Sequence, residues 1–335
     1  MKTVVSLQDL LELEIHPEEL SARYRELLAR DVGQWWRTAR REASCPGCGG
    51  AGAAEAFAQF GAQYRECVDC RSLFVSPRPD EAELIDFYRR SPSAIFWRER
   101  VWPATSAARR EKIVRPRVDW VLDGLAEYAP DAARGLDLSP YGGPFIEELS
   151  AGGCRDLTAG FPLADLDLGL APPGTSVRPL ALEAIPSAGP VDFVTAFDAV
   201  SRSSDVHALI DGVAAALRPG GLLFMTMPNA DGFDVQVLWN RHPALTPPDK
   251  LNLLSIAGLE RRLGRPAWEL LEVSTPGMFD VEQVRRVVEA DPDGEWPRFV
   301  RTLVSARDAK ARGDFQECLQ RNRLASFARV VARRR

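Results

Sequence analysis

Four cysteines near one end of the chain have the spacing of a metal site. They form two Cys-x-x-Cys pairs, Cys45 with Cys48 and Cys67 with Cys70, and eighteen residues separate the pairs. Four thiolates at this spacing can surround one zinc ion as a tetrahedron and leave no coordination position for water. In a large chain without a secretory signal, such pairs favour metal over disulfides. The pattern therefore predicts a structural zinc ion, with four unliganded buried cysteines as the alternative.

A second group of candidate residues lies in the stretch GLDLSPYGGPF, where an apolar run ends in Asp137 and a helical pattern resumes after Gly142 and Gly143. Glycine-bearing turns between a strand and a helix allow the backbone to approach a nucleotide cofactor closely. The stretch nearly has the pattern of such a loop, but Ser139 and Tyr141 stand where glycines are usual. It is therefore a candidate cofactor loop with two bulkier residues.

Three ionisable side chains in the second half of the chain are candidates for acid–base catalysis. Asp198 directly follows the strand-like run VDFVTAF, and His242 and Lys250 lie in the stretch WNRHPALTPPDKLN. Ligands of open α/β folds bind beyond the carboxyl ends of the strands, so residues just after such runs are expected to face a ligand. A catalytic base would come from these three residues, and Lys250 would serve only with a lowered pKa.

The composition is that of an ordinary globular chain. Of the 335 residues, 45% are hydrophobic and 27% are charged, and the formal net charge is −5. A nucleic-acid partner is not expected, because binding a phosphate backbone normally requires a concentrated basic surface. No stretch approaches the roughly 18 apolar residues of a membrane helix, and acids occur too early in the chain for a secretory signal. We therefore expect a cytoplasmic protein without a membrane partner.

Helical and turn patterns divide the chain into four parts. A helical pattern starts at His16, with Pro17 at the first helical position. Pro77 and Pro79 end the cysteine-bearing segment, and Pro130 precedes the first buried strand. The expected domains are an N-terminal helical segment at 1–41, a zinc ribbon at 42–78, a helical bridge at 79–130, and an α/β domain at 131–335 with a helical insertion at 279–322.

Beyond Pro130, strand-like apolar runs alternate with helical ones, which is typical of a parallel sheet covered by helices on both faces. The last apolar run follows a helical insertion instead of a single crossover helix, so we expect it to be antiparallel and inserted beside its neighbours. The sequence thus predicts a Rossmann-like α/β fold with seven strands. Six of these strands correspond to the runs GLDL, CRDLTA, VDFVTAF, GLLFMTMPN, AWELLEVSTP and ASFARVVARR.

The chain resembles class I S-adenosylmethionine-dependent methyltransferases, specifically a bacterial subgroup in which a four-cysteine zinc ribbon precedes the methyltransferase domain. Besides the cysteines, the resemblance rests on LFVSPRP, LRPGGLLFMTMPN, PPDKLNLLS, STPGMFDVEQV and DFQECLQRNRLASFARVVARR, and it covers nearly the whole chain. It implies S-adenosylmethionine as the cofactor beside the structural zinc. It also implies a small-molecule substrate, such as a sugar or a natural-product intermediate.

The resemblance assigns roles to the loop after the first strand. In such enzymes this loop has the pattern acid-hydrophobic-Gly-x-Gly-x-Gly, and its glycines let the backbone approach the methionine part of the cofactor. Asp137 takes the acidic position and Gly143 the last glycine position, whereas Ser139 and Tyr141 replace the other two glycines. The implied cofactor contacts are Asp137, Tyr141, Gly142, Gly143, Phe197 and Asp198.

The acid that binds the ribose hydroxyls departs from the family pattern. It is expected at the end of the second strand, about twenty residues after the loop, where Gly160 stands. Asp156 precedes this position within the expected strand, and Asp165 and Asp167 follow it. Either the alignment slips by several residues or the ribose contact is missing.

Two further positions differ. Relatives commonly carry Glu-His after the fourth strand, where this chain has Ser201 and Arg202, and the histidine of a later PP-x-His-Leu-Asn motif is Lys250. Three functions remain open. The first is a methyltransferase with an altered cofactor site that acts on a small molecule. The second is a noncatalytic methyltransferase-like protein whose zinc ribbon binds or regulates a protein partner, and the third is an enzyme that uses the same site for another reaction.

Overall fold

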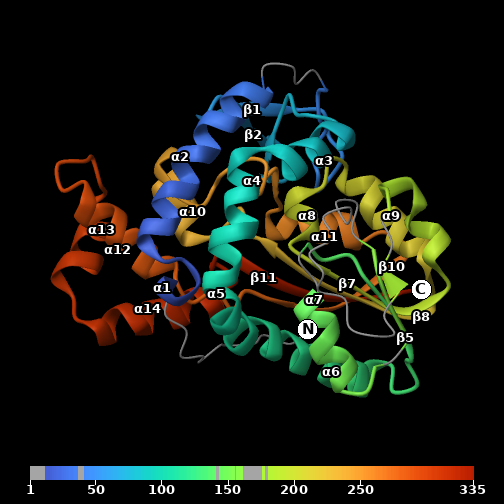
Figure 1. Cartoon of the computed structure of the whole chain (residues 1–335). Coiled ribbons are helices and arrows are strands. Elements are labelled where there is room, and N and C mark those ends of the chain that lie inside the picture. The colour runs from blue at the N-terminus through green and yellow to red at the C-terminus, as the bar shows by residue number, and fades with distance from the viewer. Residues whose placement is uncertain (1–11, 37–40, 141–142, 155, 161–175, 178–179) are drawn as a thin grey trace.

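A seven-stranded sheet forms the centre of the molecule (Figure 1). The computed structural model describes residues 12–36, 41–140, 143–154, 156–160, 176–177 and 180–335. The strands follow the order β10-β11-β8-β7-β4-β5-β6. They are β4 (Arg134–Asp137), β5 (Asp156–Ala159), β6 (Ser176–Val177), β7 (Val191–Phe197), β8 (Leu217–Pro228), β10 (Trp268–Ser274) and β11 (Phe327–Arg334).

The last strand of the sheet runs against its neighbours. The strands from β4 to β8 pair in parallel, whereas β11 pairs antiparallel with both β8 and β10. The predicted Rossmann-like sheet, with seven strands and an inserted antiparallel last strand, is therefore confirmed. In this arrangement the carboxyl ends of β4, β5, β7 and β8 lie along one edge of the sheet, where α/β folds bind ligands.

Helices cover both faces of the sheet. On one face, α6 (Arg115–Tyr128) and α7 (Gly143–Ala151) pack against Phe193, Phe197 and Phe224. On the other face, α9 (Val206–Ala216) and α11 (Ile256–Leu263) pack against alternating residues of the same strands, such as Val194 and Met225. Strand residues point alternately to the two faces, so apolar runs without polar interruption are expected in a sheet buried on both sides.

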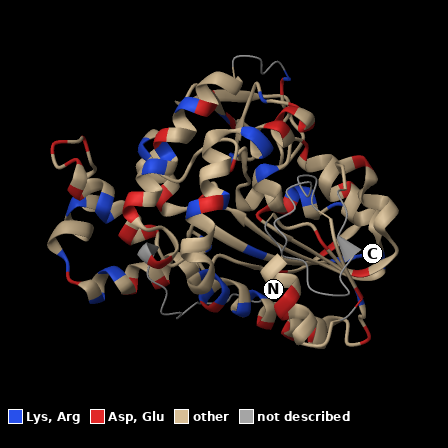
Figure 2. Cartoon of the chain, in the orientation of Figure 1, with Lys and Arg blue, Asp and Glu red and all other residues tan. Residues whose placement is uncertain are grey.

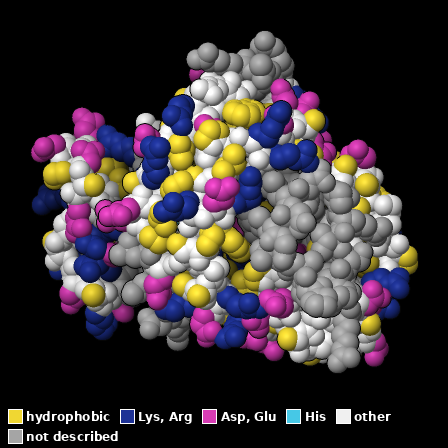
Figure 3. Space-filling model, in the orientation of Figure 1, with side chains coloured by type: hydrophobic (Ala, Val, Ile, Leu, Met, Phe, Trp, Pro, Cys, Tyr) yellow, Lys and Arg dark blue, Asp and Glu magenta, His cyan; other side chains and the backbone are white. Residues whose placement is uncertain are grey.

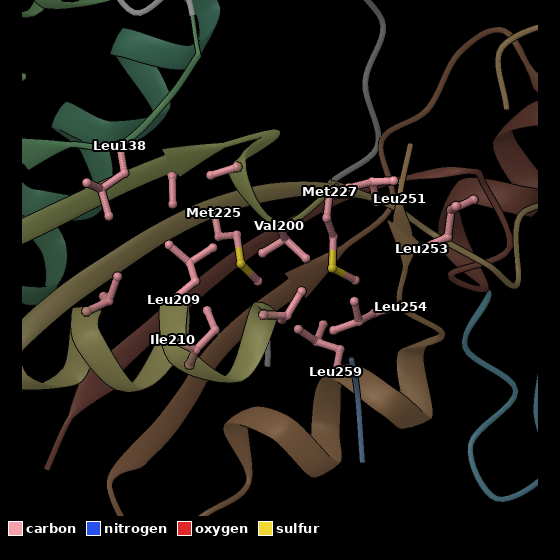
Figure 4. Close-up of a cluster of buried hydrophobic side chains, with 14 of the residues drawn as sticks. Leu138, Val200, Leu209, Ile210, Met225, Met227, Leu251, Leu253, Leu254 and Leu259 are labelled. Carbon is pink, nitrogen blue, oxygen red and sulfur yellow. The ribbon is translucent and has the colours of Figure 1, made fainter. Parts of the chain in front are cut away.

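The PPDKLNLLS motif contributes to this second core. Leu251, Leu253 and Leu254 lie beside Met227 of β8 and Leu259 of α11 (Figure 4). All five side chains are almost completely buried. The motif therefore has a packing role beside any catalytic one.

The cysteine-bearing segment forms a second, four-stranded antiparallel sheet. Its order is β1-β2-β3-β9, with β1 (Ala53–Gln59), β2 (Ala62–Cys67) and β3 (Leu73–Val75) from the expected ribbon. The fourth strand, β9 (Asn252–Leu253), comes from the PPDKLNLLS motif and pairs with β3. The sequence did not predict this strand, because two residues carry no periodic signal. The ribbon is thus continuous with the α/β domain through main-chain hydrogen bonds.

Helices connect and flank the two sheets (Figure 1). The sequence pattern placed Pro17 at the first helical position, but Pro17 is the residue that precedes α2. α12, α13 and α14 form the region after β10 and enclose a small core of their own with α10. The helices are α1 (Glu12–Ile15), α2 (Glu18–Trp35), α3 (Glu81–Arg90), α4 (Pro92–Phe96), α5 (Trp102–Arg109), α8 (Ala199–Arg202), α10 (Phe233–Leu238), α12 (Asp280–Ala290), α13 (Arg298–Arg301) and α14 (Ala309–Arg321).

One helix is shorter than the sequence pattern indicated. The run DVHALIDGVAAALRPGG predicts a helix through Gly221, but α9 ends at Ala216 and β8 begins at Leu217. Pro219 lacks a backbone donor, and Gly220 adopts a φ of +82°, so neither residue continues an α-helix. β6 was also missed, since its two residues lie in a stretch rich in proline and glycine.

Charged side chains of both signs are distributed over the helices and loops (Figure 2). On the face drawn in Figure 3, acidic, basic and apolar side chains are intermingled. Among the described residues, none of the helices combines the length and the apolar character that crossing a membrane requires.

A buried arginine joins the ribbon to the α/β domain. Arg78, in the LFVSPRP motif, is 2% exposed. Its Nε donates to the Val75 carbonyl at 2.9 Å, and its Nη1 donates to Asn252 Oδ1 at 2.8 Å and to the Ser203 carbonyl at 3.4 Å. Asn252 Nδ2 donates in turn to the carbonyls of Val200 and Ser203. Two motifs that carry the family resemblance therefore meet in a structural contact.

Replacing Arg78 by Met should destabilise the protein by about 2–4 kcal/mol, because hydrogen bonds to a charged group are lost and buried acceptors remain. Urea unfolding followed by circular dichroism measures this change. The matched control is Arg90→Met, since Arg90 is exposed and pairs only with Asp86 four residues away. A loss for Arg78→Met as small as that of the control would contradict the structural role of Arg78.

Candidate functional site

The four predicted metal ligands lie together. The Sγ atoms of Cys45, Cys48, Cys67 and Cys70 are all within 4.8 Å of one another. Cys45 Sγ is 3.4 Å from Cys70 Sγ, and Cys48 Sγ is 3.5 Å from Cys67 Sγ. Zinc–sulfur bonds of about 2.3 Å in a tetrahedron would place the sulfurs about 3.8 Å apart. The four thiols therefore fit a closed zinc site.

The surroundings of most of these thiols disfavour the ionised form unless a cation is present. Burial raises the pKa of Cys45 and of Cys67. Burial also acts to raise the pKa of Cys70, but hydrogen bonds with the side chain and backbone of Ser72 outweigh it and lower this pKa to about 7. Several thiolates can persist in such a place only when a metal ion compensates their charge.

The cysteine site is packed against the α/β domain. Ser72 Oγ lies 3.4 Å from Ser255 Oγ, and the Ser255 hydroxyl donates to the Cys70 carbonyl. A Cβ atom at Gly47 would lie only 2.7 Å from the Cα of Gly258, so the first cysteine turn approaches α11 as closely as glycine allows. The ribbon is thus not an independent appendage.

The end of β4 is joined to the end of β7 by side-chain hydrogen bonds. Asp137 Oδ1 accepts from Ser139 Oγ at 2.6 Å and from Thr195 Oγ1 at 2.7 Å. Ser139 Oγ also accepts from the Phe197 amide at 2.9 Å. Burial raises the pKa of Asp137 to about 6, although these hydrogen bonds oppose the shift. Ser139, at a glycine position of the family pattern, therefore stabilises the loop start instead of obstructing it.

The rest of the loop is described only in part. Tyr141 and Gly142 lie outside the described residues. Gly143 is the first residue of α7, so the loop leads directly to the amino end of that helix. Backbone N–H groups are unpaired at such an end and can bind anionic groups.

The expected ribose acid has no room at Gly160. The Gly160 amide donates to the Asp137 carbonyl at 2.8 Å, which places it at the end of β5. A Cβ atom there would lie 2.2 Å from Leu180 Cδ1, and Leu180 is 3% exposed. Asp156 lies at the opposite edge, where it pairs with Arg134 at the start of β4. Asp165 and Asp167 are outside the described residues, so within the described part no acid stands at this strand end.

Asp198 occupies a sharp turn at the end of β7. Its φ is +57°, a left-handed conformation that aspartate tolerates better than most residues. The Asp198 amide donates to the Thr226 carbonyl at 3.0 Å, and Oδ2 lies 3.2 Å from Arg117 Nη2. Burial acts to raise the pKa of Asp198, but the charges of Arg117, Lys250 and Arg202 outweigh it and lower the pKa. Asp198 is therefore an ionised carboxylate.

The backbone of Lys250 is held by hydrogen bonds, and its ammonium group is unpaired among the described residues. Its amide donates to the Thr246 carbonyl at 3.0 Å, and its carbonyl accepts from the Tyr64 hydroxyl at 2.7 Å. Within the described residues, its Nζ has no hydrogen-bond or ion-pair partner. Burial lowers the pKa of Lys250, and the cations on Arg202 and Arg117 add to this effect, while the charges of Asp198 and Asp249 oppose it.

The neighbouring residue holds this region in place. Asp249 accepts from the hydroxyls of Tyr24 at 2.8 Å and Tyr88 at 2.9 Å, and it pairs with Arg202 Nη1 at 3.0 Å. Tyr24 and Tyr88 belong to α2 and α3. The helices before the α/β domain thus help to position Lys250.

His242 is hydrogen-bonded to Asp234 and not to Asp198 or Lys250. Its Nε2 lies 3.0 Å from Asp234 Oδ2, and its Nδ1 accepts from the Ala244 amide at 3.1 Å. Since Nδ1 is an acceptor, Nε2 carries the proton and donates to Asp234. The side chain is 4% exposed. Both ring nitrogens are therefore used internally, unlike the ammonium group of Lys250.

Sequence reasoning missed two arginines at this edge of the sheet. Arg117, on α6, lies over the rings of Phe197 and Phe327 as well as beside Asp198. Arg329, on β11, lies over the ring of Trp120 with 5.3 Å between Cζ and the ring centroid. The one available signal was an arginine inside the apolar run ASFARVVARR.

Residues 109–273 match a family model described as a methyltransferase domain. The matched segment runs from before β4 to the penultimate residue of β10 and contains Asp137, Asp198 and Lys250, but not the four clustered cysteines or β11. Together with the strand order, this match supports a class I S-adenosylmethionine-dependent methyltransferase. It does not address the zinc-ribbon subgroup. A search of curated proteins found none that matches the chain.

Solved structures with a similar fold are distant. A magnesium protoporphyrin IX methyltransferase from Synechocystis with bound S-adenosylhomocysteine is 13% identical, covering 76% of this chain and 100% of that one with a TM-score of 0.44. A Micromonospora echinaspora amino pentose methyltransferase is 27% identical over 36% of this chain and 53% of its own, with a TM-score of 0.32. A Geobacter sulfurreducens methyltransferase is 18% identical over 66% and 91%, with a TM-score of 0.33. Likeness at this level carries no argument about substrate.

Proposed function

We propose that this protein is an S-adenosylmethionine-dependent methyltransferase that acts on a small molecule and uses Lys250 as its catalytic base. The observation that carries the proposal is the position of Asp137, Phe197 and Asp198 at the carboxyl edge of the sheet, within the segment that matches methyltransferase domains. Electrostatic interactions connect Asp198 with Lys250. Four clustered thiols beside this domain, three of them buried, would hold a structural zinc ion.

The described residues fit part of the cofactor. Ser139 turns its hydroxyl into the protein, which leaves the backbone of the loop start close to the edge of the sheet. The ribose side fits less well, since Leu180 fills the place of an acid at position 160. Losing a hydrogen bond to a charged group costs about 1.5–3 kcal/mol, or roughly a ten- to hundredfold loss in affinity. We therefore propose a weakly held cofactor.

S-adenosylmethionine, when bound, supplies an electrophilic methyl group on a sulfonium. The chain's own task is to position an acceptor and to remove its proton. Asp198 is a weak base because its pKa is lowered and Arg117 pairs with it. Lys250 is a better candidate for the base. Its lowered pKa increases the fraction of neutral amine, and no described residue pairs with its nitrogen. Lys250 is therefore the proposed base, and Asp198 helps to orient it.

Calorimetric titration with S-adenosylhomocysteine tests the proposal directly. We expect saturable binding by the wild type and weaker binding by Asp137→Asn, which keeps Oδ1 as an acceptor for Ser139 and Thr195 but removes the charge. Asp156→Asn is the matched control, because Asp156 lies at the opposite edge of the sheet. No binding by the wild type at about 1 mM ligand, where even a weak site of about 4 kcal/mol would be half filled, would refute the proposal.

A second candidate is favoured by the contact between Gly160 and Leu180. A β5 end at which no described residue is an acid is compatible with a scaffold that retains the fold but carries out another reaction or binds a protein partner through its ribbon. Absence of S-adenosylhomocysteine binding in the titration above would select this candidate. Because β3 already pairs with β9, the edge of the ribbon sheet that a protein partner would meet is β1.

A further inference from the structure

Arg329 is placed where an arginine is costly. It lies within β11, opposite Thr226 of β8, so it is flanked by strands on both sides. Its Nε is buried without a hydrogen-bond partner, and across the described residues its guanidinium has no hydrogen bond or ion pair. Burial, together with the charge of Arg117, lowers the pKa of Arg329 to about 10. Arg329 as a whole is partly exposed, but a guanidinium whose Nε is buried without a partner, and which has no anion beside it, is costly.

Further cations surround the same edge of the sheet. Thr226, the partner of Arg329 in β8, accepts a hydrogen bond from the Asp198 amide through Oγ1 at 3.2 Å. Arg329 is therefore level with the turn that carries Asp198, and Arg117 interacts electrostatically with both residues. The four cations that act on this turn or on one another are Arg117, Arg202, Lys250 and Arg329, contributed by α6, α8, the segment before β9, and β11.

Three acids act on this group, Asp137, Asp198 and Asp249, against four cations, so they compensate only part of the positive charge. Asp198 pairs with Arg117, and Asp249 pairs with Arg202. Lys250 and Arg329 have no ion-pair partner in the described part of the chain. The whole protein has a net charge of −5. The excess of positive charge at this edge of the sheet is therefore local and does not follow from the overall composition. An anion supplied from outside would complete the charge balance.

Packing alone does not explain Arg329. Its guanidinium lies over Trp120, and an apolar side chain such as Met would cover that ring without bringing a buried charge. An arginine guanidinium, in contrast, offers a planar fork of N–H donors that matches the oxygens of a carboxylate or a phosphate. The cost of burying it in the free protein is understandable if those donors are used by a ligand.

We propose that Arg329, assisted by Arg117, binds an anionic group of the acceptor substrate, either a carboxylate or a phosphate. That the bound anion belongs to the acceptor substrate rests on the proposed function. The anion site itself does not depend on the cofactor. Lys250 lies near the same charges and would then act on a substrate held by its anionic group. The substrate class is thus an anionic small molecule.

Thermal unfolding of the full chain, without cofactor, tests the anion site. Sodium phosphate and sodium acetate are compared with sodium chloride at equal ionic strength and pH. We expect at least one of the two anions to raise the Tm of the wild type by about 3 °C more than chloride, because a ligand that binds only the folded state stabilises it. A shift with phosphate alone assigns a phosphate, and a shift with acetate alone assigns a carboxylate. Shifts with both anions support the site for either group.

Two variants make the result specific. Arg329→Gln should lose the shift, whereas Arg333→Gln should retain it, since Arg333 belongs to the same strand but pairs with Glu269. Arg329→Met should fold with a Tm equal to or above that of the wild type in chloride, because it removes an unpaired charge. An unshifted wild type, an equal shift in Arg329→Gln, or a lower Tm for Arg329→Met would each overturn the proposal. Anion binding without S-adenosylhomocysteine binding would retain the site and reject only the methyltransferase function.

Discussion

Removing zinc from the four-cysteine site is expected to unfold the ribbon and to destabilise the α/β domain with it. Structural zinc contributes about 10–16 kcal/mol to the folding of small zinc domains. Here β3 pairs with β9, and Arg78 links the ribbon to Asn252, so loss of the ribbon also removes contacts of the larger domain. We expect one equivalent of zinc in the purified protein and a fall in Tm of more than about 10 °C after chelation.

The corresponding variant is Cys67→Ser, and Cys154→Ser is its control. Cys154 is partly buried but lies outside the metal cluster, so its replacement should leave zinc content and Tm nearly unchanged. Metal analysis and differential scanning calorimetry measure both properties. A zinc content below about half an equivalent without chelator would count against the site. An unchanged Tm after chelation would show instead that the ribbon folds on its own contacts.

Replacing Lys250 by Met should lower kcat/KM for methyl transfer by about 10²–10⁴-fold, the usual contribution of a positioned base. Binding of S-adenosylhomocysteine should change little, because Lys250 is proposed to act on the acceptor. The reaction is followed by transfer of labelled methyl groups from S-adenosylmethionine to the acceptor of the wild type. Lys250→Arg should be similarly inactive, since it keeps the positive charge but cannot lose a proton near neutral pH. Activity in Lys250→Arg would assign Lys250 to charge alone.

The pH dependence follows from the direction of the pKa shift. Burial lowers the pKa of Lys250, so its neutral fraction at a given pH is larger than that of an ordinary lysine. The rate should therefore rise with pH through a pKa below the ordinary value of about 10.4 and then level off. Lys310 provides the contrast, because its hydrogen bond with Asp314 raises its pKa.

A labelling experiment measures this difference without an acceptor. Brief treatment with acetic anhydride over a series of pH values, followed by mass spectrometry, should show a lower midpoint pH of acylation for Lys250 than for Lys310, since only the neutral amine reacts. The sequence contains just four lysines, Lys2, Lys112, Lys250 and Lys310, so the products are readily distinguished. Each unit between the two pKa values is worth a factor of about ten in neutral amine. A midpoint for Lys250 at or above that for Lys310 would be inconsistent with a catalytic base there.

The sequence by itself determined the features that depend on local spacing. The two cysteines of a Cys-x-x-Cys turn, three positions apart, converge whatever lies around them, and the four thiols are together as expected. Long buried strands such as VDFVTAF show continuous apolar runs, and the position of the last strand followed from the helical insertion before it. The edge at which Asp137, Phe197 and Asp198 meet was predictable for the same reason, because parallel strands end on one side.

Only the tertiary structure decided what each side chain contacts. His242 and Lys250 are eight positions apart in one stretch, yet His242 is fixed to Asp234 while the Lys250 ammonium is unpaired among the described residues. Leu180 fills the space beside Gly160, so only the structure shows that a larger side chain at position 160 would collide with Leu180.

Longer separations in sequence make the same point. β9 becomes a strand only because β3, far earlier in the chain, offers an edge to pair with. Arg117 and Arg329, some two hundred residues apart, meet because α6 lies over the sheet beside β11. Such contacts depend on which elements the fold brings together, and the energy of a charge or a cavity is set by those neighbours and not by the residues next to it in sequence.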